Sequence, residues 1–116
     1  MRRMVDAFNT GDLSALNSLV SLYYVDHQGI DGSEMFGQDG FASVVKFARG
    51  SNPGLRVTIQ ELEASGDTVK ARLTWFETEP ARRPGSMEHA STQRRTLETV
   101  RFADGLAAEH WGKGLH

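Results

Sequence analysis

The sequence contains no cysteine among its 116 residues. This absence excludes disulfide bonds, thiolate nucleophiles and metal sites built on cysteine. No G-x-G-x-x-G segment follows a strand-like run, so a nucleotide cofactor is not indicated. The four histidines show neither H-x-x-x-H nor H-E-x-x-H spacing, and no carboxylate cluster accompanies them. We therefore expect no metal and no cofactor.

Neither sign of charge dominates the chain. Thirteen Lys and Arg residues are balanced by 15 Asp and Glu residues, for a net charge of −2, and the charges are spread rather than blocked. Nucleic-acid and anionic-membrane partners usually require a basic stripe, so neither is expected.

No apolar run reaches the length of a signal peptide or a membrane span, which predicts a soluble, cytoplasmic protein. A chain of this length builds one hydrophobic core, so residues 1–116 are expected to form a single domain.

Helical periodicity occupies the first half of the chain. Apolar residues recur every three or four positions from Met1 to about Phe8, and again from Leu13 to about Tyr24. The segment Asn9 to Asp12 separates these two predicted helices, because its glycine readily takes a positive φ. A third short amphipathic helix is predicted around residues 41–48, with Gly50 as its stop.

Alternating apolar and polar residues follow in the second half, which is typical of strands with one buried face. The predicted strands are residues 55–60, 69–76, 91–102 and 106–111. Gly-Asp and Asp-Gly pairs supply hairpin turns between them, and residues 77–90 are expected to form a long loop. Three helices followed by at least four antiparallel strands predict an α+β domain with the helices on one face of a curved sheet.

The order of these features is similar to a known family. The segments are NTGDLSALNSLV, YYVDHQGIDGSEMFGQDGF, NPGLRVTIQELEASGDTVKARLTWFE and RRTLETVRFADGLAAEHW. Together they resemble the SnoaL-like polyketide cyclase and ester cyclase group of the nuclear transport factor 2-like superfamily, over nearly the whole chain. The resemblance implies a cystatin-like α+β barrel, in which a cone-shaped antiparallel or mixed sheet with three N-terminal helices surrounds a deep apolar pocket.

The resemblance also implies a function. It favours a cofactor-independent cyclase or isomerase that uses acid/base chemistry on a hydrophobic, polyketide-like molecule, by aldol-type cyclisation or enolisation. The alternative is a non-catalytic small-molecule-binding or dimerisation domain, because this fold hosts both. An epoxide hydrolase or epoxide-opening cyclase is a minor alternative, since only one inward carboxylate is expected. A homodimer that pairs through the open face of the sheet is expected from the same resemblance.

His27 is the first candidate catalytic residue, because the resemblance places a histidine at this position. An imidazole titrates near neutral pH and suits a general base. The other interpretation is that His27 only orders the loop. Neighbours in an extended segment point in opposite directions, so we expect His27 inward and Asp26 capping or solvated. Helical spacing favours Tyr23 as a core residue and places the Tyr24 hydroxyl at the pocket rim.

The predicted strands offer two further candidates. Glu98 shares the parity of the apolar Val100, so its carboxylate is expected inside, unless a bulge shifts the register. It would act as acid/base with His27, or form an ion pair with Arg72 or Arg101. Trp75 has the parity of the apolar residues in its strand and is predicted either to form a flat ligand-binding wall or to belong to the core.

The last strand and the long loop supply the remaining candidates. Glu109 and Trp111 share one face, expected to contact substrate, and His110 lies on the other. Related sequences often have an aspartate after this tryptophan, whereas this chain has Gly112. The G-T-H segment of many ester cyclases is also absent. His89 in the loop either replaces its imidazole over the pocket mouth or is a solvated loop residue.

Overall fold

The computed structural model describes residues 1–78 and 91–115 of the chain. Its elements in chain order are the helix α1 (Arg2–Thr10), a short 3₁₀ turn η1 (Leu16–Ser18), the strands β1 (Val20–Ile30) and β2 (Ser33–Phe36), the helix α2 (Gly37–Ser51), and the strands β3 (Arg56–Ser65), β4 (Thr68–Thr78), β5 (Ser91–Ala103) and β6 (Leu106–Leu115). These elements confirm the predicted α+β class, with two α-helices among the described residues where three were expected.

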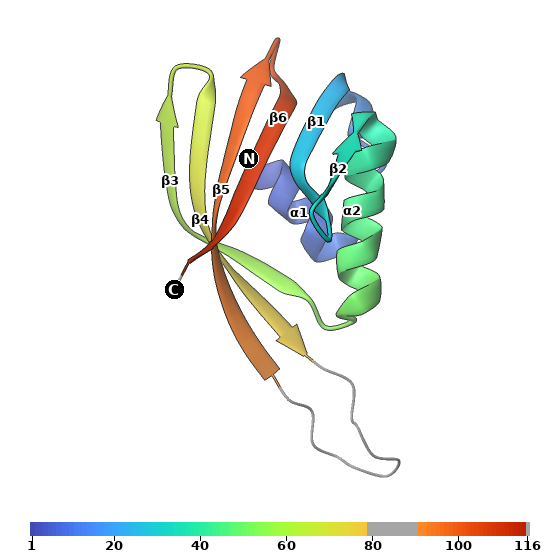
Figure 1. Cartoon of the computed structure of the whole chain (residues 1–116), viewed down its shortest axis with the longest axis vertical. Helices are drawn as coiled ribbons and strands as arrows, with labels where there is room; N and C mark the ends of the chain where they lie inside the picture. Colours follow the sequence, from blue (N-terminus) through green and yellow to red (C-terminus); the bar gives the residue numbers. More distant parts are fainter. Residues whose placement is uncertain (79–90, 116) are drawn as a thin grey trace.

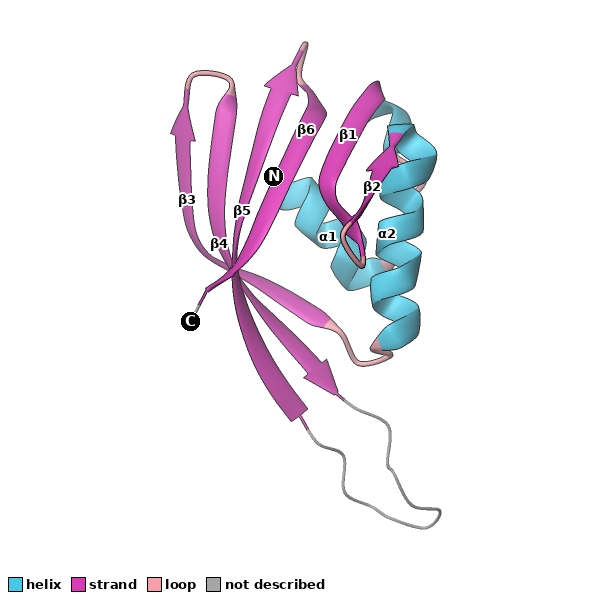
Figure 2. Ribbon diagram, in the orientation of Figure 1, coloured by secondary structure: helices cyan, strands magenta, loops and turns pink. Residues whose placement is uncertain are grey.

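The six strands of the described residues belong to one mixed sheet, in the order β2-β1-β6-β5-β4-β3, drawn in Figures 1 and 2. Strands β1 and β6 pair in parallel, and every other neighbouring pair is antiparallel. The edge strands β2 and β3 do not pair with each other. The expected barrel is therefore wrong in this respect, because the sheet is open and twisted (Figure 1).

The first helix, α1, forms where the apolar spacing predicts it. Its buried residues are Met4, Val5 and Ala7, of which Met4 and Ala7 lie three positions apart on one helix face. Gly11 ends the helix with φ 76°, and its N–H donates to the Ala7 carbonyl at 2.8 Å. A left-handed residue of this kind is the common stop for a helix, since it satisfies one of the last free carbonyls.

The helix predicted around residues 41–48 is confirmed as α2, which buries Phe41, Ala42 and Val45. Helix α2 packs against β1 and β2, whereas α1 packs against β3. Side chains of both helices line one cavity together with residues from the sheet. Both helices therefore cover the same face of the sheet.

The predicted second helix is wrong. Its segment contains only the turn η1, after which β1 begins at Val20. Leu13, Leu16 and Leu19 pack against the core, which accounts for their helical spacing. The β-branched and aromatic residues that follow favour a strand once a partner is available. Strand β6 is that partner, since Val20 pairs with Ala107.

Because the segment from Val20 is a strand instead of the predicted helix, the buried and exposed tyrosines differ from the prediction. Alternation along β1 buries Tyr24, which is 1% exposed, and leaves Tyr23 87% exposed. The helical interpretation predicted the opposite arrangement, with Tyr23 in the core. The same alternation continues along β1, so Asp26 lies on the inner face with Tyr24, and His27 lies on the outer face with Tyr23.

The four strands predicted in the second half are confirmed as β3 to β6, each slightly longer than expected. The short strand β2 was not predicted, because its glycine-rich surroundings resemble a loop. Of the predicted loop 77–90, the first two residues belong to β4 and residues 79–90 lie outside the described part.

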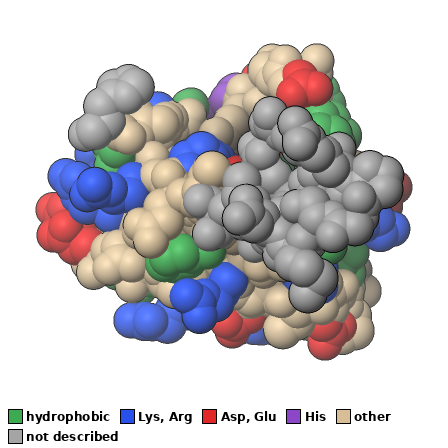
Figure 3. Space-filling view, turned by 90° about the horizontal axis from the view of Figure 1, so that it is seen from below, with side chains coloured by type: hydrophobic (Ala, Val, Ile, Leu, Met, Phe, Trp, Pro, Cys, Tyr) green, Lys and Arg blue, Asp and Glu red, His purple; other side chains and the backbone are tan. Residues whose placement is uncertain are grey.

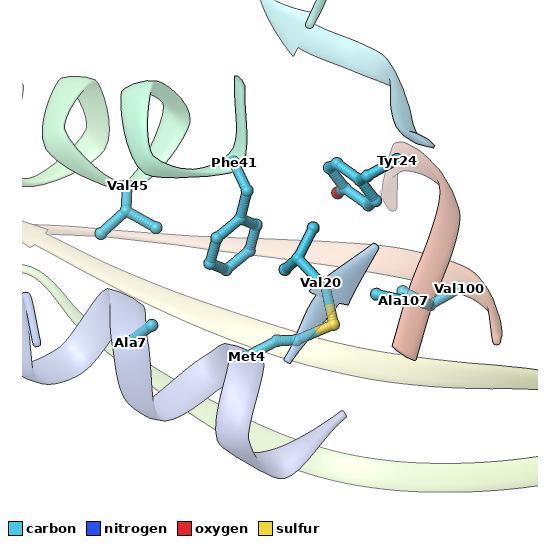
Figure 4. Packing of buried hydrophobic residues seen from close by; sticks show 8 residues of the cluster. All are labelled: Met4, Ala7, Val20, Tyr24, Phe41, Val45, Val100 and Ala107. Carbon is cyan, nitrogen blue, oxygen red and sulfur yellow. The ribbon is translucent and has the colours of Figure 1, made fainter. Parts of the chain in front are cut away.

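The core consists of two adjoining apolar clusters. One joins both helices to β1, β5 and β6, and Figure 4 shows its members: Met4, Ala7, Val20, Tyr24, Phe41, Val45, Val100 and Ala107. The other joins α1 to β3 and β4 through Val5, Val57, Leu73 and Trp75, among others. The two helices thus hold the two halves of the sheet together.

On the face in Figure 3, acidic and basic side chains are interspersed. Neither described helix is both long and apolar enough to cross a bilayer.

Candidate functional site

A cavity of about 210 Å³ lies between the two helices and the sheet face that they cover. Its walls are mainly apolar and include Phe8, Phe41, Val57, Leu73, Trp75 and Val100. Phe8 contacts both Phe41 and Trp75 edge to face, with ring centroids 6.0 and 5.4 Å apart. Such aromatic walls suit a planar apolar ligand.

Three titratable side chains gather in this otherwise apolar cavity. Asp26 of β1, Glu98 of β5 and His110 of β6 all line it, and we call them the charge cluster. The two ring nitrogens of His110 contact one carboxylate each: Nδ1 lies 2.8 Å from Asp26 Oδ1, and Nε2 lies 2.8 Å from Glu98 Oε2. Asp26 is 2% exposed and Glu98 is 4% exposed. Buried carboxylates require partners of this kind.

A bulge in β6 turns His110 into the cavity. Phe102 of β5 pairs with Ala107, but the preceding Arg101 pairs with Glu109, so β6 carries one additional residue at Ala108. Two residues opposite one shift the alternation of a strand by one position. Ala107 and His110 therefore both face inward, although simple alternation places them on opposite faces.

Glu109 and Trp111, expected to contact substrate, therefore do not line the cavity. Both side chains lie on the outer face of the sheet, opposite the cavity. Arg101 Nε donates to Glu109 Oε1 there at 3.1 Å. Trp111 is 40% exposed and does not line the cavity.

Asp26 is anchored by its own loop as well as by His110. Its Oδ1 accepts the backbone N–H groups of Gln28 and Gly29 at 3.0 and 2.9 Å. Gly29 has φ 56°, and a Cβ there would collide with the Ser33 carbonyl, so glycine is required. Burial raises the pKa of Asp26, but the bonds from His110, Gly29 and Gln28 outweigh it and hold the pKa below its usual range. Asp26 therefore caps its own loop, which is one of the two roles expected for it, but the expectation that it is solvated and turned away from the pocket is wrong.

His110 is an imidazolium at neutral pH. Burial alone lowers the pKa of His110, but the two carboxylates outweigh burial and raise it to about 9. Both ring nitrogens therefore carry protons and donate to Asp26 and Glu98. The charge cluster then holds one positive and two negative charges.

Glu98 faces inward as predicted, but its partners are different. Thr96 Oγ1 donates to Glu98 Oε1 at 3.1 Å, and Trp75 Nε1 donates to Thr96 Oγ1 at 2.8 Å. Neither His27 nor the two predicted arginines contact Glu98. Arg72 pairs with Glu61 at 3.3 Å instead, and Arg101 pairs with Glu109.

Gly112 provides the space that the Glu98 carboxylate occupies. The two residues are direct partners across β5 and β6. A Cβ at Gly112 would overlap Glu98 Oε2 and the side-chain oxygen of Gln28. Gly114, two residues further along β6, has open space around the same position. Related sequences often have an aspartate where this chain has Gly112. Here the Glu98 carboxylate, from the neighbouring strand β5, lies beside that position.

His27 lies on the outer face, so its predicted place in the pocket is wrong. Its Nδ1 is 2.5 Å from Glu34 Oε2 and its Nε2 is 2.7 Å from Glu109 Oε2. The His27 ring stacks on Trp111 with centroids 5.2 Å apart. The hydrogen bonds that the His27 ring donates to Glu109 and Glu34 raise the pKa of His27. The rule that Asp26 and His27 point in opposite directions is confirmed, but the faces are exchanged.

The other candidates have mixed outcomes. Trp75 lines the cavity as predicted and is 8% exposed. Tyr24 lines the cavity too, but within its buried wall rather than at the rim. Burial, followed by the nearby carboxylates of Asp26 and Glu98, raises the pKa of Tyr24 far above its usual value, so the phenol stays protonated. His89 lies outside the described residues.

Metal ligation finds no support in the part of the chain that the structure describes. No three histidine, aspartate or glutamate side chains within residues 1–78 and 91–115 are arranged to hold a metal ion. In the charge cluster, the two nitrogens of His110 are already directed at the carboxylates.

Comparison with known proteins agrees with the family resemblance described for the sequence. The family model for SnoaL-like polyketide cyclase matches residues 1–113. IdmH from Streptomyces antibioticus, provisionally assigned as a polyketide cyclase, is 26% identical, with a TM-score of 0.77 over 96% of this chain and 86% of its own. No curated protein sequence matches the chain.

Two further structures have the same fold at lower identity. A provisionally assigned polyketide cyclase from Bacillus cereus is 21% identical, with a TM-score of 0.80 over 97% of this chain and 69% of its own. AclR from Streptomyces galilaeus, provisionally assigned as a hydroxylase, is 24% identical, with a TM-score of 0.72 over 96% and 73% of the two chains.

The contact between Gly112 and Glu98 predicts a strong effect of one methyl group. Gly112→Ala should lower the free energy of unfolding by about 1–3 kcal/mol, because it overpacks the buried carboxylate. Gly114→Ala is the matched control and should change stability by less than about 0.5 kcal/mol, since its Cβ meets nothing. Urea denaturation measures both variants, and equal effects would contradict the assigned contact.

The raised pKa of His110 predicts how stability depends on pH. A group with a raised pKa in the folded state contributes fully below its unfolded value near 6.5 and loses that contribution as the pH rises through the folded value of about 9. The free energy of unfolding should therefore fall by on the order of 3 kcal/mol between pH 6.5 and 9.

His27 also has a raised pKa, so His27→Gln is the control for this measurement. Most of the decline should persist in His27→Gln when unfolding by urea is compared at the two pH values. A decline that disappears in this variant would assign the effect to the outer face instead of the charge cluster.

Proposed function

The chain belongs to the SnoaL-like polyketide cyclase family, and on this basis we propose that it is a cofactor-independent cyclase or isomerase that enolises a hydrophobic carbonyl compound in its cavity. The observation that carries the proposal is the Glu98 carboxylate, which lines an apolar cavity and is held by Thr96 and His110. A carboxylate in this setting is a suitable general base for a carbon-bound proton.

In the proposed reaction, Glu98 removes a proton from the carbon next to a ligand carbonyl. The electron pair of the C–H bond becomes the enolate, and Glu98 becomes a carboxylic acid. The enolate carbon then attacks a second carbonyl of the same molecule, and the new alkoxide takes the proton back from Glu98. In the isomerase version, Glu98 returns the proton to a different carbon of the enolate.

The other members of the site assist this step. His110 donates to Glu98 Oε2 and so fixes the orientation of the carboxylate. The Gln28 amide lines the cavity and is the candidate donor to the enolate oxygen. Apolar walls exclude water, which strengthens each of these interactions.

A second candidate is a non-catalytic small-molecule-binding domain. It is favoured by the completeness of the internal network, in which His110, Thr96 and Trp75 all donate within the protein. Epoxide opening is a third candidate, favoured by Asp26 as a second inward carboxylate. The homodimer and the cytoplasmic location expected from the sequence stay predictions, and the exposed Tyr23 and Trp111 on the outer sheet face are compatible with pairing there.

Hydrogen exchange tests the proposal without knowledge of the natural substrate. The protein should accelerate proton-for-deuterium exchange next to the carbonyl of 2-tetralone in D2O, followed by proton NMR. Glu98→Gln should lower the protein-dependent rate by about 10²- to 10⁴-fold, because the amide cannot accept the proton.

Glu63→Gln is the matched control on an exposed strand position and should exchange at the wild-type rate. Binding of 2-tetralone without accelerated exchange would favour the non-catalytic candidate. Diol formation from a bicyclic epoxide would favour the third candidate.

A further inference from the structure

The hydrogen-bond donors at the polar end of the cavity are directed at the protein's own carboxylates. Trp75 Nε1 donates to Thr96, and the Thr96 hydroxyl donates to Glu98 Oε1. His110, protonated at both nitrogens, donates to Glu98 Oε2 and Asp26 Oδ1. These three side chains therefore offer a ligand little donor capacity.

Acceptor capacity remains on the two carboxylates. Each carboxylate has about four acceptor positions. Glu98 accepts one hydrogen bond on each oxygen from within the described residues. Asp26 accepts three on Oδ1, and the Tyr24 hydroxyl is directed at the same carboxylate. Both carboxylates line the cavity, and the open acceptor positions of Glu98 are available to a bound molecule.

The net charge of the charge cluster also disfavours an anionic ligand. Two carboxylates and one imidazolium sum to one negative charge in an apolar, partly water-excluded cavity. An anionic group placed beside Glu98 would be repelled more strongly there than in bulk water.

The polar residues elsewhere in the lining do not cancel this effect. Arg94 lies four residues from Glu98 on β5, or about 13 Å along the strand, and its Nη2 donates to Glu77 at 3.0 Å. Its guanidinium lies 5.0 Å from the Trp75 ring. The Gln28 amide offers a donor and an acceptor equally.

We propose that the cavity selects planar, apolar ligands that present a neutral hydrogen-bond donor, such as a phenolic or enolic hydroxyl, to Glu98, and that it rejects the matching anions. This inference rests on the site of the proposed function and defines its ligand class. A phenol or enol fills the open acceptor positions, whereas a carboxylate ligand brings no proton and adds a like charge. A ligand without a donor leaves these positions unpaired.

Three probes of similar shape test the inference: 2-naphthol as the donor, 2-methoxynaphthalene without a donor, and 2-naphthoate as the anion. The chain has two tryptophans, and Trp111 lies on the outer face. A Trp111→Phe protein therefore keeps one indole N–H signal, that of Trp75 in the cavity wall. Its shift in nitrogen–proton correlation spectra gives both the location and the dissociation constant.

At pH 7, 2-naphthol should bind at least about tenfold more tightly than either other probe, as expected for one hydrogen bond to an ionised carboxylate. In Glu98→Gln, the preference over 2-naphthoate should shrink or reverse, because the amide removes a charge and supplies a donor. Glu34→Gln on the outer face is the matched control and should keep the wild-type order.

Equal or tighter binding of 2-naphthoate by the Trp111→Phe protein overturns the inference, and so does an unchanged preference in Glu98→Gln. An indole signal that none of the three probes shifts overturns it as well. If Glu98→Gln does not fold, the order measured without that substitution decides alone. Selectivity without 2-tetralone exchange would remove only the proposed catalysis, and exchange without selectivity would remove only this inference.

Discussion

The bridge of His110 between Asp26 and Glu98 is the interaction on which the rest of the site depends. Three charges are buried in an apolar cavity, which is costly unless each is paired and hydrogen-bonded. Each comes from a different strand, and the strands are neighbours in the sheet: β1, β6 and β5. The bridge therefore holds only if the pairing registers of all three strands are correct.

Several local features of the chain serve that requirement. The additional residue at Ala108 turns His110 inward. Gly29 takes a left-handed conformation so that its N–H reaches Asp26. Gly112 leaves room for the Glu98 carboxylate. Ala108, Gly29 and Gly112 carry no functional side chain. Together, however, they determine which charged groups come together in the cavity.

The part of the site on β4 and β5 could be predicted from the sequence, and the part on β1 and β6 could not. Strands β4 and β5 pair without a register shift, so simple alternation placed Trp75 and Glu98 correctly. The β1 segment carries leucines at helical spacing, and this pattern concealed a strand that begins at Val20. The bulge in β6 arises from pairing with β5 and leaves no local signal. His110 was therefore assigned to the outer face, with Glu109 and Trp111 inside. Asp26 was assigned to the outer face because the family resemblance favoured His27 as the inward residue.

The most direct test of this account is the titration of the His110 ring, followed by nitrogen–proton correlation NMR and assigned by comparison with His110→Gln. The account predicts a midpoint at about pH 9, because the imidazolium is held between two carboxylates. A midpoint at or below 6.5, the value of an unperturbed histidine, would show that the charged bridge does not exist and would contradict the account.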